Sequence, residues 1–427
     1  MDKALRHVAR LRGTVVVPGD KSVSHRAMMI GSIAEGTTEI IGSLDAADPR
    51  STLACLRSLG VRTTLAGDTL TIEGNGLRGF REPQGVLDAG NSGTTIRLLS
   101  GILAGQRFPT QISGDQYLVR RPMKRIIDPL TEMGAHIVGT ERFTAPLKIF
   151  PSDHLRGISY ELPIPSAQVK SAVLFAGLYA DGSTTVVEHH ASRDHTERML
   201  GLTPSRSNGE TRVTVTGGTR IAARQFVVGG DPSSAAFFVV AALIAKDAEV
   251  LIRNVGVNPT RVGFIEVLTS MGGAITLENR RTVGGEPIAD VAVKSSALAS
   301  SVRLEGDLIP NVIDEVPILA VAGAFSHGSF EVRDAFELRN KECDRIGAVC
   351  ENLRLMGVDV EEFEDGFAFQ GGGGLHSAPF DSYGDHRIAM AFGVAAASLQ
   401  GESVIKDSEC VDISYPSFWE TLHRLGD

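Results

Sequence analysis

The chain has 427 residues and a formal net charge of −9, with 42% hydrophobic and 22% charged residues. This length exceeds that of one ordinary hydrophobic core, so it predicts two domains of about 200 residues each. The acidic balance argues against nucleic acid or a membrane surface as partners, because both are anionic.

No segment of the sequence predicts export or a membrane span. The longest apolar run, residues 235–245, has 11 residues, whereas a membrane-spanning helix needs ~20. The first residues, MDKALRH, have no apolar centre and no small-residue cleavage site, so no signal peptide is expected. The cysteines, Cys55, Cys343, Cys350 and Cys410, form no CxxC pair, and we expect reduced thiols in a cytoplasmic protein rather than disulfides.

Two helical patterns alternate six times along the chain. The first is an amphipathic segment that ends in Leu-Gly or Met-Gly, where the glycine is expected to close the helix in the left-handed conformation. These glycines recur every 67 to 85 residues, at Gly60, Gly134, Gly201, Gly272, Gly357 and Gly426. The second is a run of Ala, Gly, Ser and apolar residues, which predicts a buried helix. Such runs begin near Lys21, Asn91, Pro165, Asp231, Val312 and Tyr383.

Stretches such as residues 36–41 and 182–187 follow the buried helices and predict strands. The repeating unit thus contains one buried helix, one amphipathic helix and several strands. The last unit has no strand after Gly426, and we expect the N-terminal strand, residues 13–17, to complete it.

The segment VVPGD at residues 16–20 recurs as VVGGD at residues 227–231, about half the chain later. We place the two crossovers between domains there. This predicts a discontinuous domain of residues 1–19 and 229–427 and an inserted domain of residues 20–228, with three units in each.

Basic residues gather where the predicted helices begin, as in KSVSHR at residues 21–26 and GDHR at residues 384–387. A helix N-terminus already carries about half a positive charge, so Lys and Arg there are locally unfavourable. A bound anion would explain the pattern, because N–H groups, dipoles and cations would converge on it. The alternative is that these cations pair with neighbouring carboxylates.

Other phosphate and metal motifs fail. A Walker A loop requires G-x-x-x-x-G-K-[ST], but Asp20 separates Gly19 from Lys21. No G-x-G-x-x-G opens a helix after a strand, and no spacing of His and Cys is typical of zinc. Among the acids, Asp314 and Glu342 lie beside cations and are interpreted either as helix-start carboxylates or as bases.

Five motifs together resemble the 5-enolpyruvylshikimate-3-phosphate synthase (3-phosphoshikimate 1-carboxyvinyltransferase) family. They lie at residues 18–26, 90–97, 114–123, 341–345 and 385–387, and the resemblance runs from about Leu11 to Leu422. It implies an α/β fold in which two domains each contain three βαβαββ units with buried parallel helices, the enolpyruvyl transferase fold. It also implies an active site in the cleft between the domains.

The resemblance further implies a reaction of the shikimate pathway, in aromatic amino acid biosynthesis. The enolpyruvyl group of phosphoenolpyruvate is transferred to the 5-hydroxyl of shikimate 3-phosphate, and phosphate is released. The family needs no metal or organic cofactor, and glyphosate inhibits it at the phosphoenolpyruvate site. Two small anionic substrates, no nucleic acid or membrane, and a monomer are therefore expected.

The resemblance also assigns roles to residues. Contacts to shikimate 3-phosphate are expected from Lys21, Ser22, Arg26, Ser166, Ala167, Gln168, Ser192, Asp314 and Lys341. Contacts to phosphoenolpyruvate are expected from Lys21, Asn91, Gly93, Arg121, Gln168, Arg345, His386 and Arg387. Asp314 would accept the proton of the 5-hydroxyl, and Glu342 with Lys21 would move the proton at the methylene carbon. Two positions depart from the family: Ala167 replaces a second Ser of many members, and Ile413 replaces a Lys that binds phosphoenolpyruvate in some.

Three alternatives stay open. The first, UDP-N-acetylglucosamine enolpyruvyl transferase, uses a loop Cys, but no Cys lies between Cys55 and Cys343. The second is an RNA-phosphate-handling relative, which the negative charge and the 6% of aromatic residues disfavour. The third is a non-catalytic binding module, which the retention of Asp314, Glu342 and the arginines disfavours.

Overall fold

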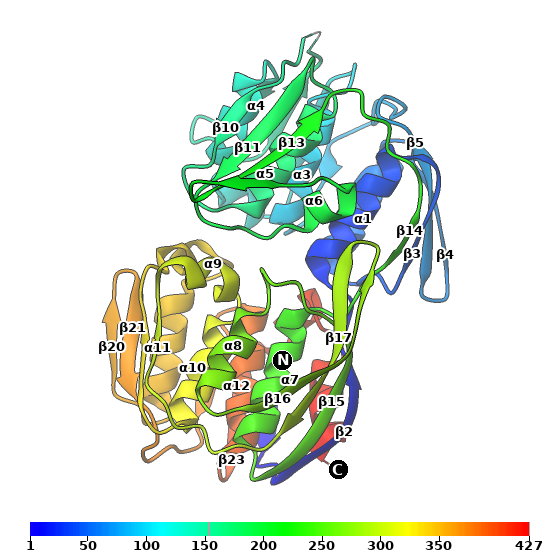
Figure 1. Cartoon of the computed structure of the whole chain (residues 1–427). Helices are drawn as coiled ribbons and strands as arrows, with labels where there is room; N and C mark the ends of the chain where they lie inside the picture. Colours follow the sequence, from blue (N-terminus) through cyan, green and yellow to red (C-terminus); the bar gives the residue numbers. More distant parts are fainter. Residues whose placement is uncertain (153, 427) are drawn as a thin grey trace. The chain divides into compact units, whose positions relative to one another are not determined.

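The computed structural model describes residues 1–152 and 154–426. It divides into two compact units (Figure 1). The first unit contains Met1–Pro18, Gly229–Arg281 and Pro287–Asp427, and the second contains Gly19–Val228 and Thr282–Glu286. These boundaries differ from the expected ones in two places. Gly19 belongs to the second unit, and so does the hairpin tip Thr282–Glu286. In that unit, Glu286 Oε1 lies 2.9 Å from His195 Nδ1.

Each unit has its own hydrophobic core. Within the described residues, each core surrounds three buried helices, as the sequence predicted. In the second unit these are α1 (Lys21–Ile33), α3 (Gly93–Leu103) and α5 (Ala167–Gly177). In the first unit they are α7 (Pro232–Ile244), α10 (Val316–Phe325) and α12 (His386–Ser398), which lie against one another (Figure 1).

The amphipathic pattern, the first of the two, forms the other helices, which cover these cores. They are α2 (Ala47–Ser58), α4 (Lys124–Glu132), α6 (His195–Leu200), α8 (Gly263–Ser270), α11 (Arg345–Leu355) and α13 (Phe418–Gly426). The glycines that follow the first five are left-handed, with φ between +72° and +96°, which confirms the predicted caps. The sixth prediction is wrong, because Gly426 is the last residue of α13 itself. A Cβ on Gly426 would lie 2.5 Å from Val8 Cγ1, so close packing explains this glycine.

The second unit contains three four-stranded sheets with one common order, according to its described residues. The first sheet orders β14 (Gln225–Val227), β3 (Glu35–Ile41), β5 (Thr69–Asn75) and β4 (Arg62–Ala66). The second orders β6 (Leu87–Asp88), β7 (Thr110–Ser113), β9 (Leu147–Phe150) and β8 (His136–Val138). The third orders β10 (Ser159–Glu161), β11 (Ser183–Glu188), β13 (Glu210–Thr216) and β12 (Ser205–Ser207). In each, the first two strands are parallel and the other contacts are antiparallel.

The first unit repeats this order, but its last sheet differs. One sheet orders β2 (Arg10–Val16), β15 (Asp247–Gly256), β17 (Glu286–Lys294) and β16 (Ala274–Val283). The next orders β18 (Val302–Leu304), β19 (Ser329–Val332), β21 (Gly366–Gln370) and β20 (Val360–Phe363). The last, as far as the described residues define it, has three strands: β1 (Lys3–Arg6), β23 (Glu402–Lys406) and β22 (Pro379–Asp381).

The strand that completes the last unit is therefore not the one that the sequence predicted. Residues 13–17 overlap β2, which pairs in parallel with β15 and not with β23. The last sheet needs an antiparallel partner for β23, and β1 supplies it. The two crossovers account for the position of β2. It precedes α1 in the chain, but it pairs with β15, the strand that follows α7. In the same way β14 precedes α7, but it pairs with β3, the strand that follows α1. The two halves thus exchange their first strands.

The remaining elements are short and lie near helix starts. They are α9 (Ile309–Val312) and the 3₁₀ turns η1 (Leu118–Arg120), η2 (Gly306–Leu308), η3 (Phe336–Asn340) and η4 (Ser408–Ile413). The four cysteines are unpaired, as predicted. In the part of the chain that is described, no single helix meets the length and apolarity of a membrane span. Only the bent pair Gly306–Val312 and Val316–Phe325 does so jointly.

Small residues allow the buried helices of the second unit to approach closely. Gly101 of α3 faces the backbone of α5, and a Cβ built on it would lie 2.1 Å from the carbonyl oxygen of Ala172. No real Cβ contact is so short, so only glycine permits this crossing. The crossing matters for the ends of these helices, because it sets the position of α5 against α3.

We expect Gly101→Ala to destabilise the protein by about 3 kcal/mol or more, at the upper end of the effect of overpacking. The clash involves backbone, which cannot rotate away. Gly85→Ala is the matched control, because its Cβ would have no heavy atom within 4 Å. Urea-induced unfolding of both variants measures the difference, and equal midpoints would contradict this account of the helix crossing.

Candidate active site

In most buried helices, the residue directly before the helix has an acidic or hydroxyl side chain. This side chain accepts a hydrogen bond from the backbone of the first turn, which is the usual N-cap. The caps are Asp20, Ser92, Ser166, Asp231 and Asp385. The helix α10 differs, since Asp314 lies two residues before its start and its N-cap, Glu315, makes no such bond. Four predicted site residues, Lys21, Gly93, Ala167 and His386, come directly after these caps, and so they lie at helix N-termini.

In the second unit, one group of predicted residues surrounds the start of α3. The side chain of Arg121 donates to Asn91 Oδ1, and Asn91 Nδ2 donates to Asp115 Oδ2 at 2.8 Å. A Cβ on Gly93 would lie 3.3 Å from Arg121 Nη1 and 3.0 Å from Arg97 Nη1. The structure therefore brings two guanidinium groups against the one residue of this turn that has no side chain.

Arg97 links this group to α5. Its Nη1 donates to Gln168 Oε1 at 2.6 Å, and Gln168 Nε2 donates to Thr94 Oγ1 at 3.2 Å. Arg97 is buried and was not assigned a role from the sequence, although its motif was recognised. Its position four residues after Gly93, on the same helix face, was the available signal.

A second group surrounds Arg26 on α1. This buried guanidinium donates to Thr196 Oγ1 at 2.7 Å, to Ser171 Oγ at 2.9 Å and to the carbonyl oxygen of Ser22 at 3.0 Å. Burial lowers the pKa of Arg26 to about 10, so it is still a cation at neutral pH. At the start of α1, Lys21 Nζ lies 3.2 Å from Asp48 Oδ2.

The other predicted residues of this unit lie at the start of α5 and in the loop before α6. Ser166 caps α5 through the N–H of Val169, and Ala167 is its first residue. The hydroxyl of Ser192 donates to Glu188 at the end of β11.

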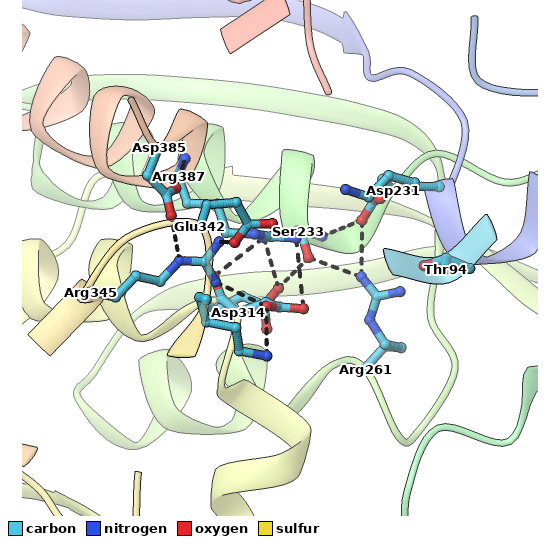
Figure 2. Close-up of polar contacts among 12 residues, drawn as sticks. Thr94, Asp231, Ser233, Arg261, Asp314, Glu342, Arg345, Asp385 and Arg387 are labelled. Atoms are coloured by element: carbon cyan, nitrogen blue, oxygen red, sulfur yellow. Dashed lines mark hydrogen bonds and ion pairs between the residues drawn. The ribbon is translucent and has the colours of Figure 1, made fainter. Parts of the chain in front are cut away.

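In the first unit, one buried arginine is held by three carboxylates (Figure 2). Arg345 Nε donates to Asp385 Oδ2 at 2.8 Å, Nη2 to Glu342 Oε2 at 2.6 Å and Nη1 to Asp314 Oδ1 at 3.2 Å. Burial lowers the pKa of Arg345, but the three carboxylates outweigh it and raise the pKa above the ordinary value. Arg345 therefore fixes both predicted catalytic carboxylates with one rigid, permanently charged group.

Two further cations face Asp314. Arg387 Nη2 lies 3.7 Å from Asp314 Oδ2, and Lys341 Nζ lies 4.0 Å from Asp314 Oδ1. Opposite charges at this range favour the ionised form of a carboxylate. His386 is buried beside Arg387, while burial raises the pKa of the Cys343 thiol and leaves it protonated at neutral pH.

These contacts agree with the alternative given for the basic helix starts, because Lys21, Arg345 and Arg387 each have carboxylate neighbours. Each helix cap also places a polar oxygen just before them. The basic residues therefore belong to alternating networks of charge, in which a carboxylate base and cationic binding groups share contacts. In residues 1–152 and 154–426, no group of three or more His, Cys, Asp or Glu is placed to hold a metal ion.

We expect Asp385→Ala to destabilise the first unit by about 3–5 kcal/mol, because it leaves the buried Arg345 without a main partner. Asp385 also accepts from the backbone N–H groups of Arg387 and Ile388, so a helix cap is lost as well. The matched control is Asp247→Ala, which removes exposed ion pairs with Arg10 and Arg12. The control should shift the urea midpoint far less, because exposed ion pairs contribute little to stability. Similar losses in the two variants would contradict the importance of the buried contact.

Comparison with known proteins places this geometry in a family. The family model described as EPSP synthase (3-phosphoshikimate 1-carboxyvinyltransferase) matches residues 5–422. A 3-phosphoshikimate 1-carboxyvinyltransferase of Geobacter sulfurreducens is 50% identical over 423 residues, covering 98% of each chain. That of Pelobacter propionicus is 51% identical and covers 97% of this chain and 96% of its own. The solved EPSP synthase of Acinetobacter baumannii has a TM-score of 0.89 and 42% identity, covering 100% of this chain and 98% of its own. The chain belongs to the EPSP synthase family.

Proposed function

We propose that this protein transfers the enolpyruvyl group of phosphoenolpyruvate to the 5-hydroxyl of shikimate 3-phosphate and releases phosphate. The observation that carries the proposal is the set of charges around Asp314. One carboxylate contacts Arg345 and faces Lys341 and Arg387, and a second, Glu342, contacts the same arginine. Family membership along nearly the whole chain supports the same reaction.

The chemistry requires these residue types. The 5-hydroxyl must lose a proton while it attacks the central carbon of phosphoenolpyruvate, and Asp314 is the proposed acceptor. The methylene carbon must gain a proton and later lose one, and Glu342 with Lys21 is proposed for that step. Lys341, Arg345 and Arg387 place three cations within 4.0 Å of Asp314 in the absence of substrate.

Fixed cations also suit the substrates, which carry phosphate and carboxylate groups. Arg121, Arg345 and Arg387 are proposed to bind phosphoenolpyruvate, because guanidinium groups bind such anions in a bidentate manner. In the second unit, Arg26, Ser166, Gln168 and Ser192 are proposed to bind shikimate 3-phosphate. Each substrate anion would then replace part of the pairing that carboxylates now supply.

We also propose that the protein acts in the cytoplasm, which its four unpaired thiols support. Action as a monomer and without nucleic acid stays a prediction from the sequence. The direct experiment measures phosphate release from phosphoenolpyruvate with shikimate 3-phosphate, with UDP-N-acetylglucosamine or with neither. Release only with shikimate 3-phosphate supports the proposal. Release with the sugar nucleotide would favour the alternative transferase, and no release in any mixture would favour a binding module.

We expect Asp314→Asn to reduce kcat by roughly 10²–10⁴-fold, because the amide keeps the shape but cannot accept the proton. The Kd for shikimate 3-phosphate should change much less. Asp359→Asn is the control, since Asp359 is an exposed carboxylate of the same unit. Turnover within a few-fold of the unchanged protein would mean that Asp314 is not the base and would transfer that role to Glu342.

Gly93→Ala should raise the KM for phosphoenolpyruvate by roughly tenfold, since an intruding methyl group costs about 1–3 kcal/mol. The added Cβ would press on Arg97 and Arg121. Inhibition by glyphosate should weaken more than phosphoenolpyruvate binding, because glyphosate is the longer ligand. The KM for shikimate 3-phosphate should stay within about twofold. In the control Gly85→Ala, whose added Cβ would have no heavy atom within 4 Å, the KM for each substrate should also stay within about twofold. Unchanged inhibition and an unchanged phosphoenolpyruvate KM would show that Gly93 does not line that site.

A further inference from the structure

A buried lysine in the second unit has no part in the reaction described so far. Lys170 lies one turn into the buried helix α5, and only 1% of its side chain is exposed. Its ammonium group lies 2.7 Å from Glu188 Oε2 and 2.6 Å from Glu197 Oε1. Both carboxylates are themselves buried. Removing three charges from water costs several kcal/mol for each, so such a cluster calls for a reason beyond stability.

The cluster contacts the proposed shikimate 3-phosphate residues along two branches. On the first branch, Glu188 uses one oxygen for Lys170 and the other for the hydroxyl of Ser192. Lys170 therefore holds the carboxylate that orients Ser192. Since Glu188 ends β11 and Ser192 lies in the following loop, this contact also ties the loop to the sheet.

On the second branch, Glu197 is the neighbour of Thr196 on α6, and the hydroxyl of Thr196 accepts from Arg26 Nε. Ser171, the neighbour of Lys170 on α5, accepts from Arg26 Nη2 and lies 2.6 Å from Thr196 Oγ1. Pairing of Lys170 with Glu197 thus joins α5 to α6 at the point where both helices hold Arg26. Ser171 also donates to the carbonyl oxygen of Ala167, at the start of α5.

These bonds leave Arg26 prepared for an anion. A guanidinium group has five N–H donors. Among the described residues, Arg26 makes three hydrogen bonds, so two donors remain for a ligand. Together with Arg26, the cluster of Lys170, Glu188 and Glu197 has two positive and two negative groups. Burial raises the pKa of Glu197, and Lys170 opposes that effect.

We propose that Lys170, through Glu188 and Glu197, is a positioning residue that holds Ser192 and Arg26 in the geometry that binds shikimate 3-phosphate. It touches no substrate itself. This inference rests on the proposed function, since it names the ligand of that function. It predicts a specific defect: loss of Lys170 weakens the binding of shikimate 3-phosphate but does not weaken the binding of phosphoenolpyruvate to the same extent.

The first variant is Lys170→Met, which removes the charge and keeps a long apolar side chain. We expect the Kd for shikimate 3-phosphate, measured by calorimetry without phosphoenolpyruvate, to rise by roughly 10–100-fold, the usual effect of losing a charged hydrogen bond. The KM for phosphoenolpyruvate should stay within about twofold. Lys170→Arg retains the charge and should recover part of the lost affinity. The matched control is Lys148→Met, on the exposed face of β9.

A purely structural role gives a different result. It would lower the melting temperature and the active fraction, and hence kcat, while the Kd of the folded molecules for shikimate 3-phosphate stayed the same. A folded Lys170→Met protein with a Kd within about twofold of the unchanged protein would therefore overturn the proposal. So would an equal loss of affinity for both substrates.

Thr196→Val provides the test if Lys170→Met does not fold. It keeps every buried charge and nearly the same volume, and it removes the Thr196 hydroxyl, one of the two hydroxyls that accept from Arg26. We expect about a tenfold rise in the Kd for shikimate 3-phosphate, and an unchanged Kd would overturn the second branch. Binding of shikimate 3-phosphate to the unchanged protein separates a failure of the proposed function from a failure of the role of Lys170. If it does not bind shikimate 3-phosphate, the proposed function fails, whereas binding that no variant alters refutes the role of Lys170 alone.

Discussion

The fold depends on helices that have no side facing water. The helices α7, α10 and α12 are apolar around their whole circumference and pack on one another, and α1, α3 and α5 are buried in the same way. Such helices expose polar groups only at their ends, because a polar group elsewhere would need a buried partner. Close packing therefore restricts most of the chemistry to helix N-termini, where free backbone N–H groups already favour anions.

Burial then dictates how each charge is held. Arg345 and Lys170 are both almost fully inaccessible, and each contacts two or more carboxylates at close range. In a medium of low dielectric constant an unpaired charge is expensive, so the partners arise from physical necessity. The consequence for function is rigidity. A guanidinium group bonded to three carboxylates, or an ammonium group bonded to two, fixes those groups more firmly than solvent would.

The six-fold repetition explains how equivalent residues acquire different roles. Asp20 and Asp231 occupy matching positions after the exchanged strands, and their side chains cap α1 and α7 through the N–H of Val23 and of Ser233. Yet α1 continues with Lys21 and Arg26, whereas α7 continues with small and apolar residues. The repeat thus provides a capped helix start in five of the six buried helices, all except α10, and the residues after the cap determine whether that start can bind an anion.

The sequence by itself determined the alternation of helices, the buried set, five of the six glycine caps and the two crossover points. These features follow from local periodicity and from the conformational freedom of glycine, which act over a few residues. Motifs also identified the family and the candidate residues. Only the tertiary structure decided that β1 rather than β2 completes the last sheet, because strand pairing joins segments about 400 residues apart.

Tertiary structure alone also decided which charges meet. Lys170 was visible in the sequence as a single cation in an apolar helix, but its partners lie 18 and 27 positions away on other elements. Likewise, the basic helix starts appeared uncompensated in the sequence, although Asp385 contacts Arg345 across 40 positions. Ion pairs depend on distances of a few ångströms in space, and a linear pattern contains that information only after the chain has folded.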